Sequence, residues 1–341
     1  MTTTARVRLA LCALLAFAGL TGAATAETAA EFYKGKTVFL QIGSGIGGNY
    51  DTIGRLFARH MGKNIPGAPS VVVQNVAGLQ LANQFGNTTA RDGTYLGVFT
   101  NGMPTIPLIE PKAGHFDTRK FIFLGSPNRQ SQWLGVWRTA RAQTLDDVFK
   151  TETILGVTAP GFASFDYPRL TNAILGSKFK IIPGYKGMGD IKVALEQGEA
   201  EGAFVSLSNV KGDFAQVIAA GDFRLLAAFG MKAGSAPVNA PLMPLGKTPE
   251  ERQLFELMYA RQDYGTPFLL PPDVPADRAA ALRQAFEATM ANAAFLEEAQ
   301  KLSIDIEPVS ADELTRLTAR LYETSPDVIA RMLSILSPDS K

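Results

Sequence analysis

Alternating strand-like and helix-like segments are the feature that most constrains the fold of this chain. Short runs rich in β-branched and aromatic residues predict strands at 36–42, 70–74, 95–100, 121–125, 133–137, 154–158, 179–182, 203–207, 224–229 and 266–270. Helical patterns follow many of these runs, an order that favours parallel sheets with helices on both faces. The run at 70–74 is continuously apolar, which is typical of a buried parallel strand.

Capping residues predict several helix boundaries. Residues 248–251 (TPEE) combine a capping box with a proline in the first helical turn, and Gly198 ends a helix that begins at residue 188. Asp51 is expected to cap the helix after the first strand. Alanine-rich amphipathic patterns predict two long helices near the C-terminus, over 276–302 and 310–335. The chain is therefore expected to be an α/β protein.

The first 26 residues are typical of a secretory signal peptide. Arg6 and Arg8 supply positive charge, and residues 9–20 form an uncharged run, shorter than the roughly 20 residues that span a bilayer. Ala24-Thr25-Ala26 matches a small-x-small cleavage site, so cleavage is predicted after Ala26. Cys12, the one cysteine of the sequence, lies inside this segment. The predicted mature chain therefore has no thiol for a disulfide, a nucleophile or a metal.

Composition and motifs argue against two broad classes of function. The net charge of +1 gives no electrostatic footprint for nucleic acid. The two histidines, His60 and His115, are not accompanied by a G-x-S-x-G nucleophile motif or by H-E-x-x-H zinc spacing. We therefore expect no metal and no other cofactor, and a secreted α/β enzyme remains an alternative.

A glycine-rich loop joins the first predicted strand to the first predicted helix. In residues 43–51 (GSGIGGNYD), backbone N–H groups at the positive end of a helix dipole suit an anion, although one or two glycines could instead serve turns with positive φ. Gly43, Gly45 and Gly48 also fit the pattern G-x-G-x-x-G, so a nucleotide-binding protein stays open as an alternative. The dinucleotide-binding pattern also requires an acidic residue after the second strand, but this chain has Asn75 at that position.

Two later loops lie in the same position between a strand and a helix. In residues 159–166, Ser164 can cap the helix or bind a ligand oxygen, and the sequence leaves both readings open. Asp166 would repel an anion, so its side chain is expected to point away from one. In residues 185–190, Lys186 can pair with a carboxylate or remain a solvated surface lysine. Together the three loops predict an anion site built from helix N-termini.

Seven short segments, in their order and spacing, match those of one protein family. They are residues 32–36 (FYKGK), 43–51, 65–67 (IPG), 71–75 (VVVQN), 91–94 (RDGT), 185–187 (YKG) and 271–275 (PPDVP). From about residue 32 onward the sequence thereby resembles the tripartite tricarboxylate transporter receptors, solute-binding proteins also called Bug receptors.

The chain departs from the pattern of this family at the glycine-rich loop and at two other places. Ile46 and Asn49 stand where proline and glycine are usual, and the segment at 77–80 is shorter than its counterpart. Phe162 and Phe165 occupy a loop that the family tends to fill with small residues. This aromatic bulk could favour an aromatic or apolar acid, or it could pack at the start of the helix.

The resemblance implies a two-lobed type II periplasmic binding protein fold, in which each lobe is a mostly parallel sheet flanked by helices. Lobe 1 is expected to comprise residues 27–127 and 231–341, and lobe 2 residues 128–230, after the signal peptide at 1–26. The implied function is that of a periplasmic receptor for a small organic mono- or dicarboxylate, aromatic acids included. Integral-membrane permease subunits are its expected partners, nucleic acid is not, and a monomer is expected.

The resemblance also places the ligand between loops of both lobes. One carboxylate is expected to meet the backbone N–H groups of Gly47, Gly48 and Asn49, and the other end of the ligand to meet Ser164 and residues 185–187. Contacts from both lobes would favour a closed state. The implied ligand-binding residues are Gly45, Ile46, Gly47, Gly48, Asn49, Tyr50, Asn101, Ala163, Ser164, Tyr185, Lys186 and Gly187.

Overall fold

The computed structural model describes residues 27–158, 162–230 and 243–337. The predicted signal peptide and part of the loop at 159–166 therefore lie outside the described residues. The predicted cleavage site and the predicted lobe boundary at 230/231 lie at their edge. Within the described ranges, no helix combines the length and the apolar character that a membrane crossing requires.

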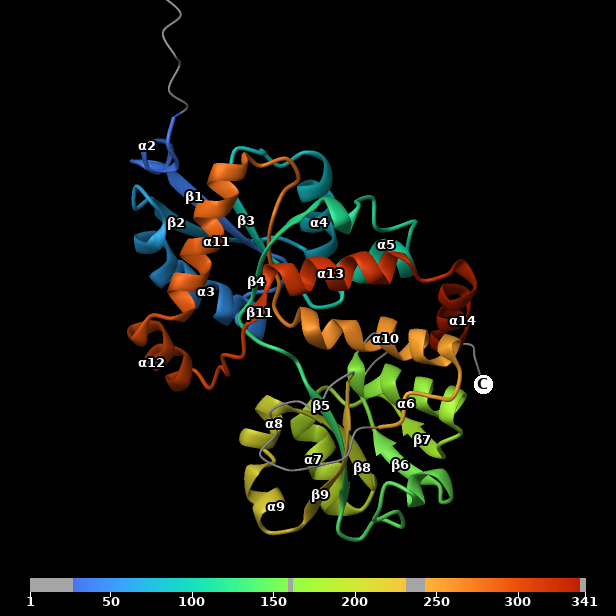
Figure 1. The fold of residues 1–341 in the computed structure, drawn as a ribbon. Helices are drawn as coiled ribbons and strands as arrows, with labels where there is room; N and C mark the ends of the chain where they lie inside the picture. Colours follow the sequence, from blue (N-terminus) through green and yellow to red (C-terminus); the bar gives the residue numbers. More distant parts are fainter. Residues whose placement is uncertain (1–26, 159–161, 231–242, 338–341) are drawn as a thin grey trace, which may run out of the picture.

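The first sheet takes its strands from both ends of the chain (Figure 1). Its strand order is β11-β4-β10-β3-β1-β2. Strands β1 to β4 run in one direction, whereas β10 and β11 run in the opposite one. The bounds are β1 Thr37–Ile42, β2 Ser70–Asn75, β3 Tyr95–Val98, β4 Ile122–Ser126, β10 Phe268–Leu270 and β11 Val309–Ser310.

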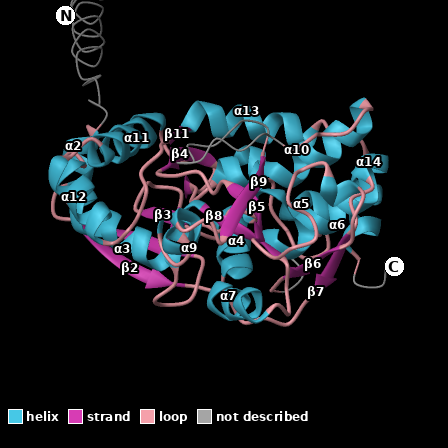
Figure 2. Cartoon of the chain, turned by 90° about the horizontal axis from the view of Figure 1, so that it is seen from below, coloured by secondary structure: helices cyan, strands magenta, loops and turns pink. Residues whose placement is uncertain are grey.

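Strand β2 corrects one expectation from the sequence. Its position matches the prediction, but its side chains alternate between exposed and half-buried, and Val72 is 44% exposed. The reason is that β2 is the last strand of the sheet and, among the described residues, pairs only with β1 (Figure 2). An apolar run of valines therefore belongs here to an edge strand, because apolar periodicity alone does not report how many neighbours a strand has.

Helices cover both faces of the first sheet, as Figure 2 shows. One face packs against α3 (Asn49–Met61), α11 (Ala276–Met290) and α12 (Ala293–Lys301). Phe57 of α3 lies at the centre of this core, 4.5 Å from the ring of Phe268, 4.9 Å from Phe286 and 4.8 Å from Phe295. The other face packs against α4 (Gly78–Asn87) and α13 (Ala311–Tyr322).

The two long C-terminal helices predicted from the sequence are each divided in two. The break between α11 and α12 is at Asn292, whose side-chain oxygen accepts hydrogen bonds from the backbone N–H groups of Ala294 and Phe295. The break between α13 and α14 (Pro326–Leu336) is at Ser325, which caps α14 ahead of Pro326. In both cases a capping residue interrupts an amphipathic pattern that continues across it.

The second sheet is built from one continuous stretch of the chain. Its strand order is β7-β6-β8-β5-β9, and only β5, the first strand after the chain leaves β4, runs against the others among the described residues. The bounds are β5 Gln132–Trp137, β6 Thr153–Gly156, β7 Phe179–Ile182, β8 Gly202–Ser206 and β9 Phe223–Phe229. Its helices are α6 (Ala163–Leu175), α7 (Met188–Gln197), α8 (Leu207–Lys211) and α9 (Ala215–Ala219).

Helix α10 (Pro249–Tyr264) lies between the two sheets in Figure 1. It begins as predicted, with the Thr248 capping box and Pro249 in the first turn. Both α10 and α14 contact α6, so the core between the sheets includes side chains from both. The division into lobes at 127/128 and 230/231 stays a prediction, and it assigns α10 and α14 to the first lobe although both pack on a helix of the second. The remaining helices are short: α2 Ala29–Tyr33, α5 Ile106–Ile109 and 3₁₀ turns at Gly62–Asn64, Met103–Thr105, Thr118–Lys120 and Asp147–Phe149.

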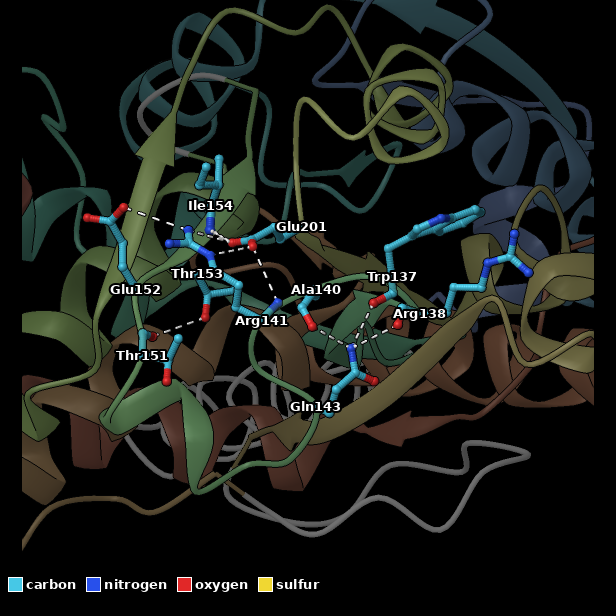
Figure 3. Close-up of polar contacts among 10 residues, drawn as sticks. All are labelled: Trp137, Arg138, Ala140, Arg141, Gln143, Thr151, Glu152, Thr153, Ile154 and Glu201. Carbon is cyan, nitrogen blue, oxygen red and sulfur yellow. Dashed lines mark hydrogen bonds and ion pairs between the residues drawn. The ribbon is translucent and has the colours of Figure 1, made fainter.

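A carboxylate ties together the end of the second sheet where β8 begins (Figure 3). Glu201 accepts hydrogen bonds from Arg141 Nε at 2.7 Å and Nη2 at 3.0 Å, and from the backbone N–H of Ile154 at 2.8 Å. Partial burial alone would raise the pKa of Glu201, but these hydrogen bonds outweigh it and hold the pKa below its usual value. The opposite end of β8 is at Ser206, where the candidate site lies.

Candidate ligand-binding site

A cavity of about 640 Å³ lies where loops of the two sheets meet. Such a volume is in the usual range for a small-molecule site. Its wall is formed by the start of α3, the segment after β3, the crossover from β4 to β5, the starts of α6, α7 and α8, Arg261 of α10, and residues 303–305. The N-terminal ends of α3 and α6, which belong to different sheets, thus face one cavity, and Met188 at the start of α7 joins them.

Five of the predicted ligand-binding residues line this cavity: Asn49, Tyr50, Asn101, Ala163 and Ser164. The others are not on its wall. Gly45, Ile46, Gly47 and Gly48 are exposed on the loop beside it. Tyr185 packs against the core of the second sheet, Lys186 is exposed, and half-buried Gly187 is the N-cap of α7. The predicted role of all these residues in binding stays a prediction.

The four glycines of the loop at 43–48 have different structural reasons. Gly47 adopts a φ of 84°, which favours glycine, and a Cβ on Gly43 would lie 3.2 Å from the Cα of Gly78. At Gly45 no atom lies within 4 Å of such a Cβ, and at Gly48 the nearest one is 3.7 Å away, with φ in the ordinary range. Two of the four glycines are therefore explained by the fold, and two are not.

Asp51 organises the glycine-rich loop from inside α3. The helix begins at Asn49 with Gly48 as its N-cap, so the prediction that Asp51 itself caps the helix was wrong. Instead the Asp51 carboxylate accepts a hydrogen bond from the Gly47 N–H at 2.9 Å and pairs with Arg55 at 2.9 Å. Burial would raise the pKa of Asp51, but these bonds and one from Asn75 hold it below its usual value. A ligand contact from Gly47 would therefore have to compete with Asp51.

Asn75 bears on the nucleotide-binding alternative. It stands where a dinucleotide fold needs an acid for the ribose, and its amide is already engaged. Its Nδ2 donates to the carbonyl of Ser44 at 3.1 Å and to Asp51 at 2.8 Å, and its Oδ1 accepts from Arg55 at 2.9 Å. Asn75 therefore holds the glycine-rich loop in place, and no observation favours a ribose site here.

Tyr50 presents a polarised hydroxyl at the cavity. Its oxygen accepts hydrogen bonds from the backbone N–H of Asn101 and from Gln130 Nε2, both at 3.1 Å. Asn101 Nδ2 in turn donates to Gln130 Oε1 at 2.7 Å, which closes the network. Burial raises the pKa of Tyr50, so the phenol keeps its proton, and no described residue accepts that proton. The network thus leaves one hydrogen-bond donor for a ligand.

The start of α6 carries a hydroxyl pair and a buried ion pair. Ser164 Oγ lies 2.8 Å from Thr158 Oγ1, and both side chains line the cavity. Ser164 does not cap α6, whose N-cap residue is Phe162. Asp166 is 2% exposed, is absent from the described cavity wall and pairs with Arg261 at 3.1 Å, which agrees with the expectation that it points away from a ligand.

Several residues of the cavity wall were not predicted from the sequence. Asn128 and Gln130 belong to the crossover between the sheets, and Arg261 lies far along the chain on α10, so only the fold brings them to the cavity. A signal did exist for residues 206–209 (SLSN). Ser206 ends β8 and forms a capping box with Asn209, which makes this a fourth strand-to-helix loop.

Other ionisable residues lie elsewhere. His60 Nε2 lies 2.6 Å from Glu298, and His115 is exposed; neither is on the described cavity wall. Among the described residues, no group of histidine and acidic side chains is arranged to hold a metal ion.

Comparison with solved structures identifies the fold. A TctC solute-binding protein from Polaromonas superposes with a TM-score of 0.68 over 88% of this chain and 99% of that chain, at 17% sequence identity. The periplasmic binding protein BugD gives a TM-score of 0.56 over 89% and 98%, at 18% identity. MatC from Rhodopseudomonas palustris, with bound malate, gives 0.55 over 89% and 99%, at 17% identity.

These similarities confirm the predicted two-lobed α/β binding-protein fold, with two mixed sheets flanked by helices. At such identities they establish the fold alone. No protein-family model matches the sequence, and a search of curated proteins found no match either. The structural neighbours named above are solute-binding or periplasmic binding proteins by name, or carry a bound carboxylate.

Proposed function

We propose that this chain is a solute-binding receptor that captures a small organic carboxylate between its two lobes and delivers it to a tripartite tricarboxylate-type membrane permease. In this proposal it acts in the periplasm after removal of residues 1–26, works as a monomer and is not an enzyme. A structural neighbour carries malate, which supports a carboxylate as the class of ligand.

One observation carries the proposal. Two helix N-termini from different sheets face a single cavity, and the Tyr50 hydroxyl adds a donor whose proton no described residue accepts. Partial positive charge at helix N-termini and O–H or N–H donors stabilise a carboxylate without a full counter-charge. Because the donors belong to different lobes, a bound acid would favour the closed arrangement by its differential affinity.

The test is a thermal-shift screen followed by calorimetry on residues 27–341. The panel holds citrate, dicarboxylates, acidic amino acids, and aliphatic and aromatic monocarboxylates, with NAD and sugars as controls. A true ligand at 100-fold over its Kd should stabilise the fold by about 2.7 kcal/mol. Binding of NAD or a sugar, with silence from every acid, would overturn the proposal.

A single substitution checks the assigned donor. Tyr50→Phe removes the hydroxyl and should weaken binding of the best acid by about 1.5–3 kcal/mol, the usual worth of a hydrogen bond to a charged group. Tyr95→Phe is the matched control, because Tyr95 lies on β3, stacks on Phe39 and is not on the cavity wall. Equal affinities for the two variants would remove Tyr50 from the site.

A further inference from the structure

The charged residues on the cavity wall leave no surplus positive charge. Among the described residues, the wall holds three charged side chains, Arg129, Arg261 and Asp305. Arg261 pairs with Asp166 at 3.1 Å, and Asp305 pairs with Lys211 of α8 at 2.5 Å.

Arg129 has several ion-pair partners. Its guanidinium contacts Asp263 directly, Glu313 at 2.9 Å and Glu307 at 3.8 Å. The Arg129 guanidinium is therefore already engaged by carboxylates of the chain itself. A ligand carboxylate in this cavity therefore depends on neutral donors and on helix N-termini.

The helix N-termini are also partly neutralised by the chain itself. Three of the four helices whose first turns reach the cavity have an aspartate there, namely Asp51 in α3, Asp166 in α6 and Asp190 in α7, whereas the five-residue α8 has none. The Asp51 carboxylate accepts a hydrogen bond from the Gly47 N–H, and the Asp190 carboxylate accepts one from the Lys186 N–H at 3.2 Å. These internal bonds reduce the number of backbone N–H donors that remain for a second ligand carboxylate. The desolvation of that carboxylate would therefore go uncompensated.

Apolar side chains gather on the second-sheet side of the cavity. Phe162, Met188, Phe204 and Leu207 line the wall there, and Ile304 joins them from the segment before β11. Phe165, in contrast, is buried beneath Arg169 and is not on the described wall, so it serves packing. Phe162 is 62% exposed and lies on the wall, which leaves its ring accessible to a ligand.

We infer that the ligand is a singly charged carboxylate with an apolar body, held by its carboxylate near Tyr50 and by its body against Phe162 and Met188. This inference rests on the proposed function and specifies its ligand class. A second carboxylate, as in malate or adipate, adds a desolvation cost for which the wall offers no counter-charge. An apolar body gains from burial against the second-sheet side.

The test compares acids that share a carbon skeleton and differ by one carboxylate. Calorimetry should give hexanoate an affinity at least about tenfold above that of adipate, and benzoate a similar advantage over terephthalate, a difference of about 1.4 kcal/mol. If the diacid of either pair binds more tightly, the inference is overturned while the proposed receptor function stands. If no acid binds to the folded protein, both fail.

Two variants examine the stated causes separately. Phe162→Ala should weaken benzoate by about tenfold, whereas Leu296→Ala, an equally simple truncation of an exposed side chain on α12, should not change it. Unchanged benzoate affinity in Phe162→Ala would remove the apolar contact from the inference.

Asp305→Asn frees Lys211 from its counter-charge and should raise adipate affinity relative to hexanoate. Asp312→Asn is the matched control, because Asp312 pairs with Arg283 at 3.6 Å on α13 and is absent from the described wall. A ratio of adipate to hexanoate affinity that does not rise in Asp305→Asn, or that rises equally in the control, contradicts the charge argument.

Discussion

Gly45 and Gly48 are glycines whose local conformation and packing would accept a side chain. Neither has a positive φ, and an added Cβ at either one would contact nothing closer than 3.7 Å. The fold therefore does not explain why glycine stands at these two positions. Close approach of a ligand to the backbone would explain it.

Alanine at these positions separates the two explanations. Gly45→Ala and Gly48→Ala should keep the free energy of unfolding within about 1 kcal/mol, because the backbone accepts alanine, and should weaken acid binding. Gly47→Ala, the control, should lose about 1–2 kcal/mol of stability because its φ is 84°. Denaturant unfolding and calorimetry measure both quantities. If Gly45→Ala and Gly48→Ala both bind the acid as tightly as the unmodified protein does, the ligand lies away from this loop.

Single residues also show where sequence reasoning ends. Tyr50 and Ser164 belong to two of the predicted strand-to-helix loops, and Asn101 was implied by the family resemblance; the structure brings all three to one cavity. Arg261 was not found, because its neighbour Asp166 is 95 positions away and nothing local marks the pair. Residues whose role depends on long-range packing leave no pattern in their own segment.

At the scale of elements, Glu201 joins three strands of the second sheet. Glu201→Gln should cost about 1–2 kcal/mol at pH 7, because the charge-assisted bonds from Arg141 are lost. Glu152→Gln is the control, since Glu152 is 54% exposed and lies 3.8 Å from the same arginine. Its loss should be near zero.

The pH dependence of this pair of variants follows from the lowered pKa of Glu201. A carboxyl whose folded pKa lies below its unfolded value stabilises the fold above the unfolded pKa, and this contribution is lost as pH falls through the folded pKa. The difference in unfolding free energy between unmodified protein and Glu201→Gln should therefore shrink as the solution is acidified below about pH 4. A difference that stays constant into acid contradicts the assignment.

Helix boundaries marked by strong local signals were predicted well, and others were not. The Thr248 capping box and the Gly198 stop are both observed. The breaks at Asn292 and Ser325 were missed although each is a capping residue, because the apolar pattern continues across them. The edge position of β2 could not be predicted, because it depends on which strands pair and not on β2 itself.

At the scale of the whole molecule, α10 and α14 connect the two sheets. Gln262 of α10 donates to the hydroxyl of Tyr167 in α6 at 3.1 Å, beside the pair of Arg261 and Asp166. The core around these contacts is continuous from one sheet to the other. Any closing motion must therefore either preserve this packing or break it at considerable cost.

This continuity predicts cooperative unfolding. Ligand-free protein should show one calorimetric transition whose calorimetric and van't Hoff enthalpies agree, since the core that contains α10 also contains side chains from both sheets. Two resolved transitions, or a van't Hoff enthalpy well below the calorimetric one, would show that the lobes unfold independently.

The order of strands in the first sheet has a consequence for synthesis of the chain. The described neighbours of β4 are β10 and β11, which come more than 140 residues after it, whereas all five strands of the second sheet lie within residues 132–229. During translation the second sheet can assemble while β4 and one edge of β3 are still unpaired. Such long-range pairing is slow to form, and a chain truncated before residue 268 would carry open strand edges that favour aggregation.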